Sequence, residues 1–344
     1  MLKSIKKALR VLLAAGIAAG SLGAAPLAAG DTVTLVGAGA TFPYPIYSKW
    51  FDEFHKKNPD VEINYQSIGS GGGIRQVTAK TVDFGATDGP MTNDQLFAVD
   101  GKILHLPTVM GAVVVVYNLP SFNGKIQITG SVLADIFLGK IKSWDDPALA
   151  SLNKGLSLPS VPIVVIHRSD GSGTSYCFTD YLSKVSDAWK SKVGKGTAVN
   201  WPAGLGGKGN EGVSGTVKQT AGGIGYVELI YAVQNKIPFM AVKNKSGRFV
   251  EASVEGVTAA AKGAEIPADF RVSITDAEGE DAYPISTFTW LLVYERTGGR
   301  KGEILHDFLL WMLNDGEKIA PSLGYAPLPD AVAAKVKEAA EKVR

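Results

Sequence analysis

Three short segments of the chain place hydroxyl side chains and glycines where a strand-like run turns into a helix-like run. They are GAGATFP (37–43) with Thr41, GSGGG (69–73) with Ser70, and DGSGTS (170–175) with Ser172, Gly173 and Thr174. Each combines hydroxyl groups, room for close backbone approach and the unpaired N–H groups of a helix start, where the helix dipole is positive. Because such turns lie together at the carboxyl ends of parallel strands, the segments predict one binding site for an anion.

Two charged residues accompany the third segment. Arg168 comes just before it and can supply a two-pronged, charged donor to an anion. Asp170 follows Arg168 by two residues and carries a negative charge, like the expected anion. It is close enough in sequence to pair with Arg168, and it could also be an ordinary turn or cap residue for the helix that follows.

Enzymatic chemistry is disfavoured by the residue pattern. GSGTS lacks the GK[ST] ending of a nucleotide-binding loop, and Asp170 replaces the first glycine of the G-x-S-x-G motif. The single cysteine, Cys177, fits a small core residue better than a catalytic thiol. His167 would point away from Arg168 in an alternating strand. The four histidines are scattered, without zinc-ligand spacing: His55, His105, His167 and His306. We therefore expect no catalytic residue, metal or cofactor.

Short apolar runs alternate with helix-like runs over most of the chain, which predicts an α/β fold with mostly parallel sheets. Strands are expected at VTLVGAG, VEINYQSIG, VDFGATD, GAVVVVYN, PIVVIHR and TFTWLLVYE. Helices are expected at PIYSKWFDEFHKKNP, GGIRQVTAK, TSYCFTDYLSKV, KGEILHDFLLWMLND and PDAVAAKVKEAAEKV. GLGGKGNEG is expected to be a loop near the site, where Lys208 either attracts anions or only faces solvent.

Residues 1–30 have the pattern of a cleavable secretory signal peptide. Four basic residues precede the apolar run VLLAAGIAAGSL, small residues follow, and that run is shorter than the ~20 residues that a membrane span needs. No cysteine stands at the boundary, so we expect a periplasmic protein without a lipid anchor. Removing the signal changes the net charge from +2 to −2, since it carries four positive and no negative residues. A near-neutral chain offers no broad basic surface for nucleic acid.

Longer stretches around these residues resemble a known family. The segments GAGATFPYPIYSKW, YQSIGSGGGIRQVTAKTVDFGATDGPM, DIFLGKIKSWDD, RSDGSGTSYCFTDYL, WPAGLGGKGNEGV and GGIGYVE are similar, in order and spacing, to the periplasmic phosphate-binding protein of the ABC-type phosphate importer. The resemblance runs from about Leu35 to Val332. It implies a two-lobed periplasmic binding protein of the type II kind, each lobe a mixed, mostly parallel sheet flanked by helices. Residues 31–118 and 286–344 would form a discontinuous lobe I and residues 119–285 lobe II, with the ligand in the cleft between them.

The resemblance also implies a ligand, a set of ligand residues and a partner. The ligand would be inorganic phosphate, and the partner the membrane permease of the phosphate ABC transporter, served by a monomeric, non-enzymatic protein. Phe42 would contribute its backbone N–H, and Thr87 stands where the family often has serine. The implied ligand residues are Thr41, Phe42, Ser70, Asp88, Arg168, Ser172, Gly173 and Thr174.

The two carboxylates would then have different tasks. Asp88, at the end of DFGATD, could accept a hydrogen bond from the proton that phosphate keeps near neutral pH and sulfate lacks; its ordinary role would be to cap the next segment. Asp170 would orient Arg168. The alternatives are a sulfate- or molybdate-type binding protein, whose sites rely on neutral donors, and a periplasmic phosphoester hydrolase, which needs a metal cluster or a nucleophile–base pair.

Overall fold

The computed structural model describes residues 32–343, so the signal peptide predicted at residues 1–30 lies outside the described part of the chain. Its strands are β1 (Val33–Gly39), β2 (Val61–Ser67), β3 (Phe84–Thr87), β4 (Ile103–Asn118), β5 (Gln127–Ile128), β6 (Val164–Arg168), β7 (Leu205–Gly207), β8 (Gly223–Glu228), β9 (Ala241–Lys243), β10 (Phe249–Val250) and β11 (Ser286–Tyr294). They form an eight-stranded sheet of order β2-β1-β3-β11-β4-β8-β6-β7 and a three-stranded sheet of order β10-β9-β5.

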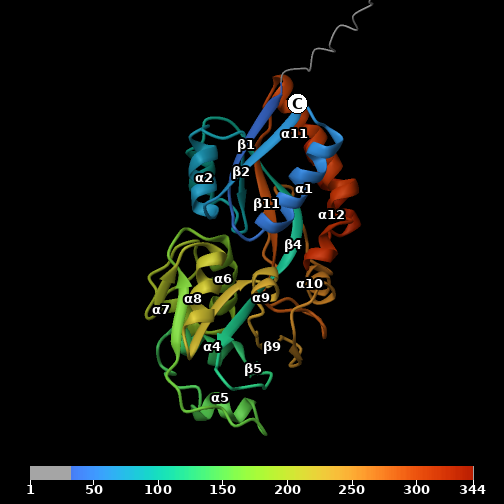
Figure 1. Cartoon of the computed structure of the whole chain (residues 1–344). Helices are drawn as coiled ribbons and strands as arrows, with labels where there is room; N and C mark the ends of the chain where they lie inside the picture. Colours follow the sequence, from blue (N-terminus) through green and yellow to red (C-terminus); the bar gives the residue numbers. More distant parts are fainter. Residues whose placement is uncertain (1–31, 344) are drawn as a thin grey trace, which may run out of the picture. The chain divides into compact units, whose positions relative to one another are not determined.

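Helices follow most of the strands (Figure 1). They are α1 (Tyr44–Lys57), α2 (Ser70–Thr78), α3 (Asn93–Phe97), α4 (Gly130–Phe137), α5 (Pro147–Leu152), α6 (Gly173–Val185), α7 (Asp187–Lys192), α8 (Gly209–Gln219), α9 (Leu229–Asn235), α10 (Val254–Ala261), α11 (Gly299–Trp311) and α12 (Asp330–Ala340). A π-helical turn (Met312–Gly316) extends α11, and a short 3₁₀ helix (Ala320–Leu323) follows it. Within residues 32–343, none of these helices has the length and apolar character needed to cross a membrane.

The eight-stranded sheet is parallel at both ends and antiparallel in its centre. β2, β1 and β3 run parallel, as do β8, β6 and β7. In contrast, β11 is antiparallel to β3 and β4, and β4 is antiparallel to β8. The predicted α/β class is confirmed, whereas mostly parallel pairing holds only toward the two ends. A continuous apolar run such as that in β4 indicates burial on both faces and does not report the direction of neighbouring strands.

β4 is the strand that connects the two ends of the sheet (Figure 1). Residues 103–112 pair with β11, and Val113–Asn118 pair with β8. The strand begins eight residues earlier than the predicted GAVVVVYN segment. The added part contains Pro107 beside a register shift between Thr289 and Trp290, which leaves Thr108 as the extra residue of a bulge. A bulge tolerates proline because the missing N–H is not needed by the ladder there.

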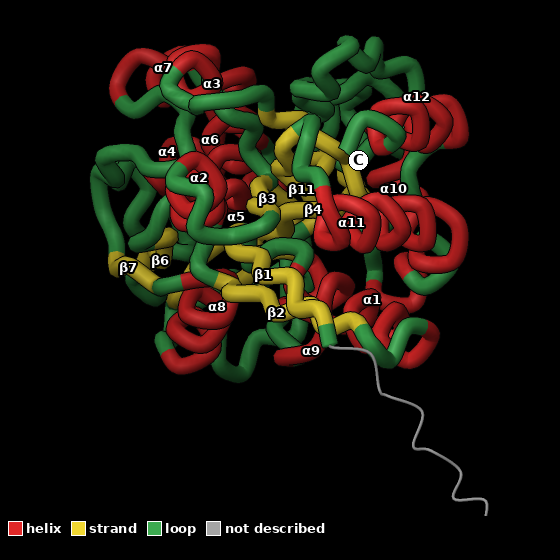
Figure 2. Tube along the Cα trace, turned by 90° about the horizontal axis from the view of Figure 1, so that it is seen from above, coloured by secondary structure: helices red, strands yellow, loops and turns green. Residues whose placement is uncertain are grey.

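Helices cover both faces of each parallel end. α2 lies on one face of β1 and β3, and α1 and α11 lie on the other (Figures 1 and 2). At the opposite end, Gly225 and Tyr226 of β8 point to opposite faces because side chains alternate along a strand. A Cβ at Gly225 would face Val213 and Val217 of α8, while the Tyr226 ring stacks on Phe178 of α6 at 4.2 Å. The strands β1–β3 run opposite to β6–β8, because β11 is antiparallel to β3 and β4 and β4 is antiparallel to β8. The carboxyl ends of the two groups therefore face each other, and the starts of α2, α6 and α8 lie where the groups meet (Figure 1).

α2 packs on the sheet through its backbone at Gly73. A Cβ at this position would lie 2.6 Å from the Ala38 carbonyl oxygen and 2.8 Å from that of Ala86. These atoms belong to β1 and β3 and cannot rotate away. Glycine at position 73 therefore sets how closely the start of α2 approaches the ends of the two strands.

Replacing Gly73 tests this close approach. We expect Gly73→Ala to lower the free energy of unfolding by about 1–3 kcal/mol, because the methyl group overpacks against backbone. Gly215→Ala in α8 is the matched control, since a Cβ there meets open space and alanine is the better helix former, by up to about 1 kcal/mol. Urea unfolding of both variants provides the measurement. Equal stability of the two variants would contradict the packing proposed for α2.

Candidate functional site

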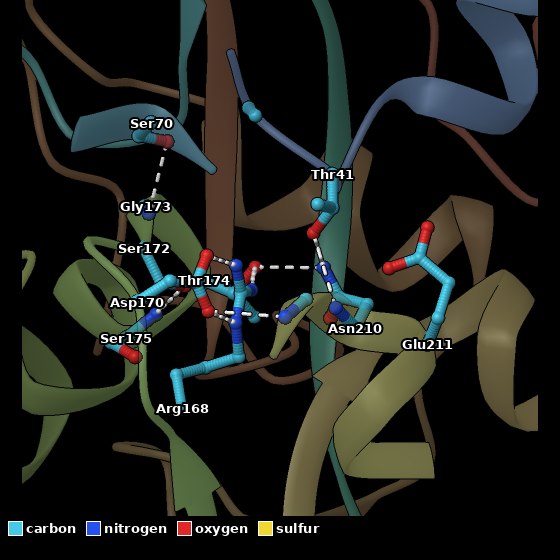
Figure 3. Close-up of polar contacts among 12 residues, drawn as sticks. Thr41, Ser70, Arg168, Asp170, Ser172, Gly173, Thr174, Ser175, Asn210 and Glu211 are labelled. Carbon is cyan, nitrogen blue, oxygen red and sulfur yellow. Dashed lines mark hydrogen bonds and ion pairs between the residues drawn. The ribbon is translucent and has the colours of Figure 1, made fainter. Parts of the chain in front are cut away.

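The three predicted helix starts come together, and a fourth joins them (Figure 3). The backbone N–H of Gly173 donates to Ser70 Oγ at 3.0 Å, which joins the starts of α2 and α6. Asn210 Nδ2, at the start of α8, donates to Thr41 Oγ1 at 2.7 Å. The site is therefore built from turns that follow β1, β2, β6 and β7.

Thr41 and Phe42 form the turn between β1 and α1, and two tyrosines hold this turn by its carbonyls. Tyr231 donates its hydroxyl to the Thr41 oxygen at 2.6 Å, and Tyr325 donates to the Phe42 oxygen at 2.7 Å. The Phe42 ring is fully buried in the core, edge-on to Tyr325. Phe42 can thus face the site only through its backbone, as predicted, and its N–H has no acceptor among residues 32–343.

Ser70 opens α2 as predicted, but its hydroxyl does not cap that helix. Ser70 Oγ accepts from the backbone N–H of Gly173 and, at 3.3 Å, from that of Asp88. The residue before it, Gly69, has φ +86°, and a Cβ there would collide with Asp170 Oδ2. Only glycine fits that backbone and that contact. The start of α2 thus lies directly against the DGSGTS segment.

Ser172 caps α6. Its Oγ accepts from the backbone N–H of Ser175 at 3.0 Å, and its backbone is extended as in an ordinary N-cap. A Cβ at Gly173 would lie 2.5 Å from Asp88 Oδ2 and 2.6 Å from Ser70 Oγ, so only a glycine admits these neighbours. Thr174 Oγ1 accepts from Asn210 Nδ2 at 3.1 Å. The start of α6 thus contacts the starts of α2 and α8, and Asn210 links it to Thr41.

Arg168 is paired with Asp170, and this prediction is confirmed. Nε donates to Oδ1 at 2.8 Å and Nη2 to Oδ2 at 2.5 Å, with the Arg168 side chain 1% exposed. The backbone N–H of Gly209 also donates to Asp170 Oδ1 at 3.0 Å. Burial alone would raise the pKa of Asp170, but the bonds and charge of Arg168 and the Gly209 N–H outweigh it, so the pKa lies below its usual value. Asp170 therefore stays ionised beside Arg168.

Asp88 lies just after β3 and is 1% exposed. Its Oδ1 accepts from Thr289 Oγ1 of β11 at 3.0 Å, next to the register shift in that strand. Burial raises the pKa of Asp88 to about 7, against the opposing effects of the Thr289 hydroxyl, the Arg168 charge and the Thr174 N–H. Near neutral pH this carboxyl can therefore hold or release a proton, which suits a group that must match a ligand's own proton.

The hydroxyl groups of the site share one hydrogen-bonding pattern. Each oxygen accepts from N–H groups, which can only donate, so each hydroxyl hydrogen remains to be donated elsewhere. Within the described chain none of these hydroxyls has an acceptor for that hydrogen, although all are buried. The four residues are Thr41, Ser70, Ser172 and Thr174. A buried cluster of unpaired O–H donors beside Arg168 is suited to an anion.

Two parts of the site were not predicted. GLGGKGNEG is not a loop: Leu205–Gly207 form β7 and Gly209 begins α8, so the loop prediction is wrong. The missed signal is its resemblance to DGSGTS, glycines at a strand-to-helix turn. This turn places Asn210 in the site, whereas Lys208 is exposed. Thr289 carries no local signal, because only the pairing of β11 with β3 brings it to Asp88.

The residues set aside as non-catalytic lie in ordinary structural environments. His167 stacks on Trp201 at 4.9 Å, away from the Arg168 side chain. Cys177 is buried, and burial raises the pKa of its thiol, which disfavours the reactive thiolate. Residues 32–343 contain no group of His, Cys, Asp and Glu side chains that could hold a metal ion.

Comparisons with known proteins place the chain in a family. Residues 26–316 match the PBP superfamily domain. The chain is 47% identical to the phosphate-binding protein PstS of Pasteurella multocida, over 88% of each chain. It is 40% identical to PstS of Methanocaldococcus jannaschii, covering 88% of this chain and 84% of that one.

Solved structures share the fold at low sequence identity. A phosphate-binding protein from Stenotrophomonas maltophilia has a TM-score of 0.67 at 18% identity, over 89% of this chain and 93% of that one. A phosphate-bound substrate-binding protein from Clostridium perfringens, described as a putative phosphate ABC transporter component, has a TM-score of 0.64 at 19% identity, over 86% and 100%. The likeness in fold and the high identity to curated relatives agree: this chain belongs to the PBP superfamily and, within it, to the family of the phosphate-binding protein PstS.

Proposed function

We propose that the chain binds inorganic phosphate in the periplasm and delivers it to the membrane permease of a phosphate ABC transporter, as a monomer and without turnover. The main observation in support of this ligand is the set of four buried hydroxyls beside the buried guanidinium of Arg168. Their hydrogens lack an acceptor within residues 32–343. A tetrahedral oxyanion offers acceptors in several directions at once. The identity to PstS proteins supports phosphate as that oxyanion.

We propose as ligand groups the residues predicted from the sequence. Thr41, Ser70, Ser172 and Thr174 would donate their hydroxyls, Phe42 and Gly173 backbone N–H groups, and Arg168 the edge of its guanidinium that Asp170 leaves open. Asp88 would accept the proton that phosphate carries. A sulfate- or molybdate-type site gains nothing from a buried carboxylate, because a fully deprotonated anion has no hydrogen to give it.

We propose that residues 31–118 with 286–344 form lobe I and residues 119–285 form lobe II. The change of partner along β4 supports a crossing between the lobes within this strand, since residues 103–112 pair with β11 and Val113–Asn118 with β8. The pairing changes after residue 112, six residues before the proposed bound. Thr41, Ser70 and Asp88 would then belong to lobe I, and Arg168 to Thr174 to lobe II. An anion that contacts both sides stabilises the closed arrangement through those differential contacts.

The function is tested by calorimetric titration of the purified protein. Phosphate should bind at one site, and sulfate should bind about 10⁴-fold more weakly or worse, because a site that pairs a ligand O–H rejects the analogue without it. Incubation with a phosphomonoester should release no phosphate. Sulfate binding as tight as phosphate binding, or steady phosphomonoester turnover, would instead support one of the alternative functions.

Asp88→Asn tests the role of the buried carboxyl in selection. The amide offers donors where the carboxylate offered none, so sulfate affinity should rise and phosphate affinity should fall, measured in the same titration. Because lowering the pH protonates Asp88, wild-type rejection of sulfate should also weaken from pH 8 to pH 5. If the variant still rejects sulfate as strongly as the wild type, Asp88 does not select phosphate over sulfate.

The raised pKa of Asp88 also predicts how the free energy of unfolding depends on pH. The folded pKa of Asp88, about 7, lies above the unfolded value of about 4, so the folded protein holds the extra proton between these pH values. Wild-type stability without ligand should therefore decrease as the pH rises from about 4 to 7, and this part of the slope should vanish in Asp88→Asn. Urea unfolding at pH 5 and pH 8 measures the difference.

Arg168→Ala tests the location of the site. Removing one partner of a buried, bonded charge leaves Asp170 unpaired, and we expect phosphate affinity to fall by about two to five kcal/mol of binding free energy. Arg248→Ala is the matched control, since Arg248 is an exposed arginine paired with Glu280 and Asp281. Normal phosphate binding by Arg168→Ala would show that the anion binds elsewhere.

A further inference from the structure

Asn210 is the most strongly bonded polar side chain of the site that the sequence did not predict. It stands at the second position of α8 and is fully buried. Its Nδ2 donates to Thr41 Oγ1 at 2.7 Å and to Thr174 Oγ1 at 3.1 Å, and its backbone N–H donates to Thr41 Oγ1 at 3.2 Å (Figure 3). One amide thus contacts hydroxyls from two separate helix starts.

The orientation of this amide is fixed by the backbone. Asn210 Oδ1 accepts from the backbone N–H of Glu228 at 2.9 Å, and an N–H group can only donate. The oxygen of the amide must therefore face Glu228, which leaves the NH₂ group facing the two threonines. Glu228 is itself held in place as the N-cap of α9, where its Oε2 accepts from the Ile230 N–H at 2.8 Å.

The consequence concerns the direction of the threonine hydroxyls. Both oxygens receive hydrogens from Asn210, so neither hydroxyl can direct its own hydrogen at Asn210. Thr174 Oγ1 also lies 3.5 Å from Arg168 Nη1, another group that can only donate. Each hydroxyl hydrogen must then find an acceptor outside this set of donors, and the ligand is the group that can supply one.

We propose that Asn210 is a positioning residue that keeps the hydroxyls of Thr41 and Thr174 as donors to the bound oxyanion, and that its bonds to both threonines tie the two lobes together around it. The proposal rests on the proposed function, because it takes the anion and the lobes from there. Asn210 itself does not contact the ligand. It sets the polarity of two groups that do.

Two substitutions test the proposal. Asn210→Ala removes the donors and frees both threonine hydroxyls to point elsewhere, so phosphate should bind about tenfold to a hundredfold more weakly. Asn210→Asp has the same shape and keeps an acceptor for the Glu228 N–H, but it turns a donor into an acceptor. The aspartate variant should bind phosphate more weakly than the alanine variant, yet unfold at a higher temperature than the alanine variant. A role in packing alone predicts the reverse, with the better-packed aspartate variant binding phosphate more tightly.

A double-mutant cycle separates polarity from packing and from charge. Thr41→Val removes one hydroxyl that Asn210 orients, so in that background Asn210→Ala should weaken phosphate binding at least about threefold less than it does in the wild type. Asn153→Ala is the matched control: this buried asparagine bonds Gln127 and Leu149 away from the site, and its loss should lower stability without changing affinity.

Calorimetric titration with inorganic phosphate distinguishes the outcomes. If the wild type binds phosphate and either Asn210 variant binds it equally well, the proposal for Asn210 is overturned and the proposed function stands. Equal losses from Asn210→Ala with and without Thr41→Val would also overturn it. If Asn210→Ala does not fold, Asn210→Asp alone decides between the two results. A wild type that binds no phosphate would overturn the proposed function itself.

Discussion

The site depends on one constraint: a hydroxyl oxygen that accepts from an N–H must send its own hydrogen somewhere else. Helix starts and one asparagine supply these N–H groups, and the hydroxyls of Thr41, Ser70, Ser172 and Thr174 receive them. Backbone N–H groups cannot reverse their role, so the polarity of most of the site is built into the fold. Little charge is needed for this arrangement, which agrees with the low net charge of the sequence, +2.

The two carboxylates, Asp170 and Asp88, differ in protonation because their surroundings differ. Asp170 is held ionised by Arg168 and by the Gly209 N–H, and it lies against Gly69, whose missing side chain leaves room for it. Among residues 32–343 no cation is paired with Asp88, and burial raises its pKa to about 7. One carboxylate therefore orients and partly neutralises the arginine, while the other, in the proposed site, would exchange a proton with the ligand. Two residues of the same type take different tasks because only one has a salt-bridge partner.

The sequence was sufficient where a residue's role depends on its immediate neighbours. Thr41, Ser70 and Ser172 could be located because strand-to-helix turns rich in glycine have a local pattern, and Asp170 could be paired with Arg168 across two residues. Asn210 has a similar local pattern, but the four glycines that precede it in GLGGKGNEG are equally typical of a loop. Thr289 could not be found, since its contact with Asp88 depends on how β11 pairs with β3, a separation of about two hundred residues. The antiparallel centre of the sheet was unpredictable for the same reason, because apolar runs report burial and not pairing.

The protonation of Asp88 links the stability of the folded protein to the proposed selection of phosphate over sulfate. Without an anion, burial favours the protonated carboxyl, and the protein is less stable once that proton is lost at higher pH. A protonated phosphate restores the missing hydrogen bond by bringing its own proton, so it relieves the burial cost of the ionised carboxylate. Sulfate brings no proton and leaves two negative charges in contact. In the proposed site, the group that weakens the ligand-free protein near neutral pH would thus be the one that distinguishes phosphate from sulfate, and a more stable side chain at position 88 would lose this discrimination.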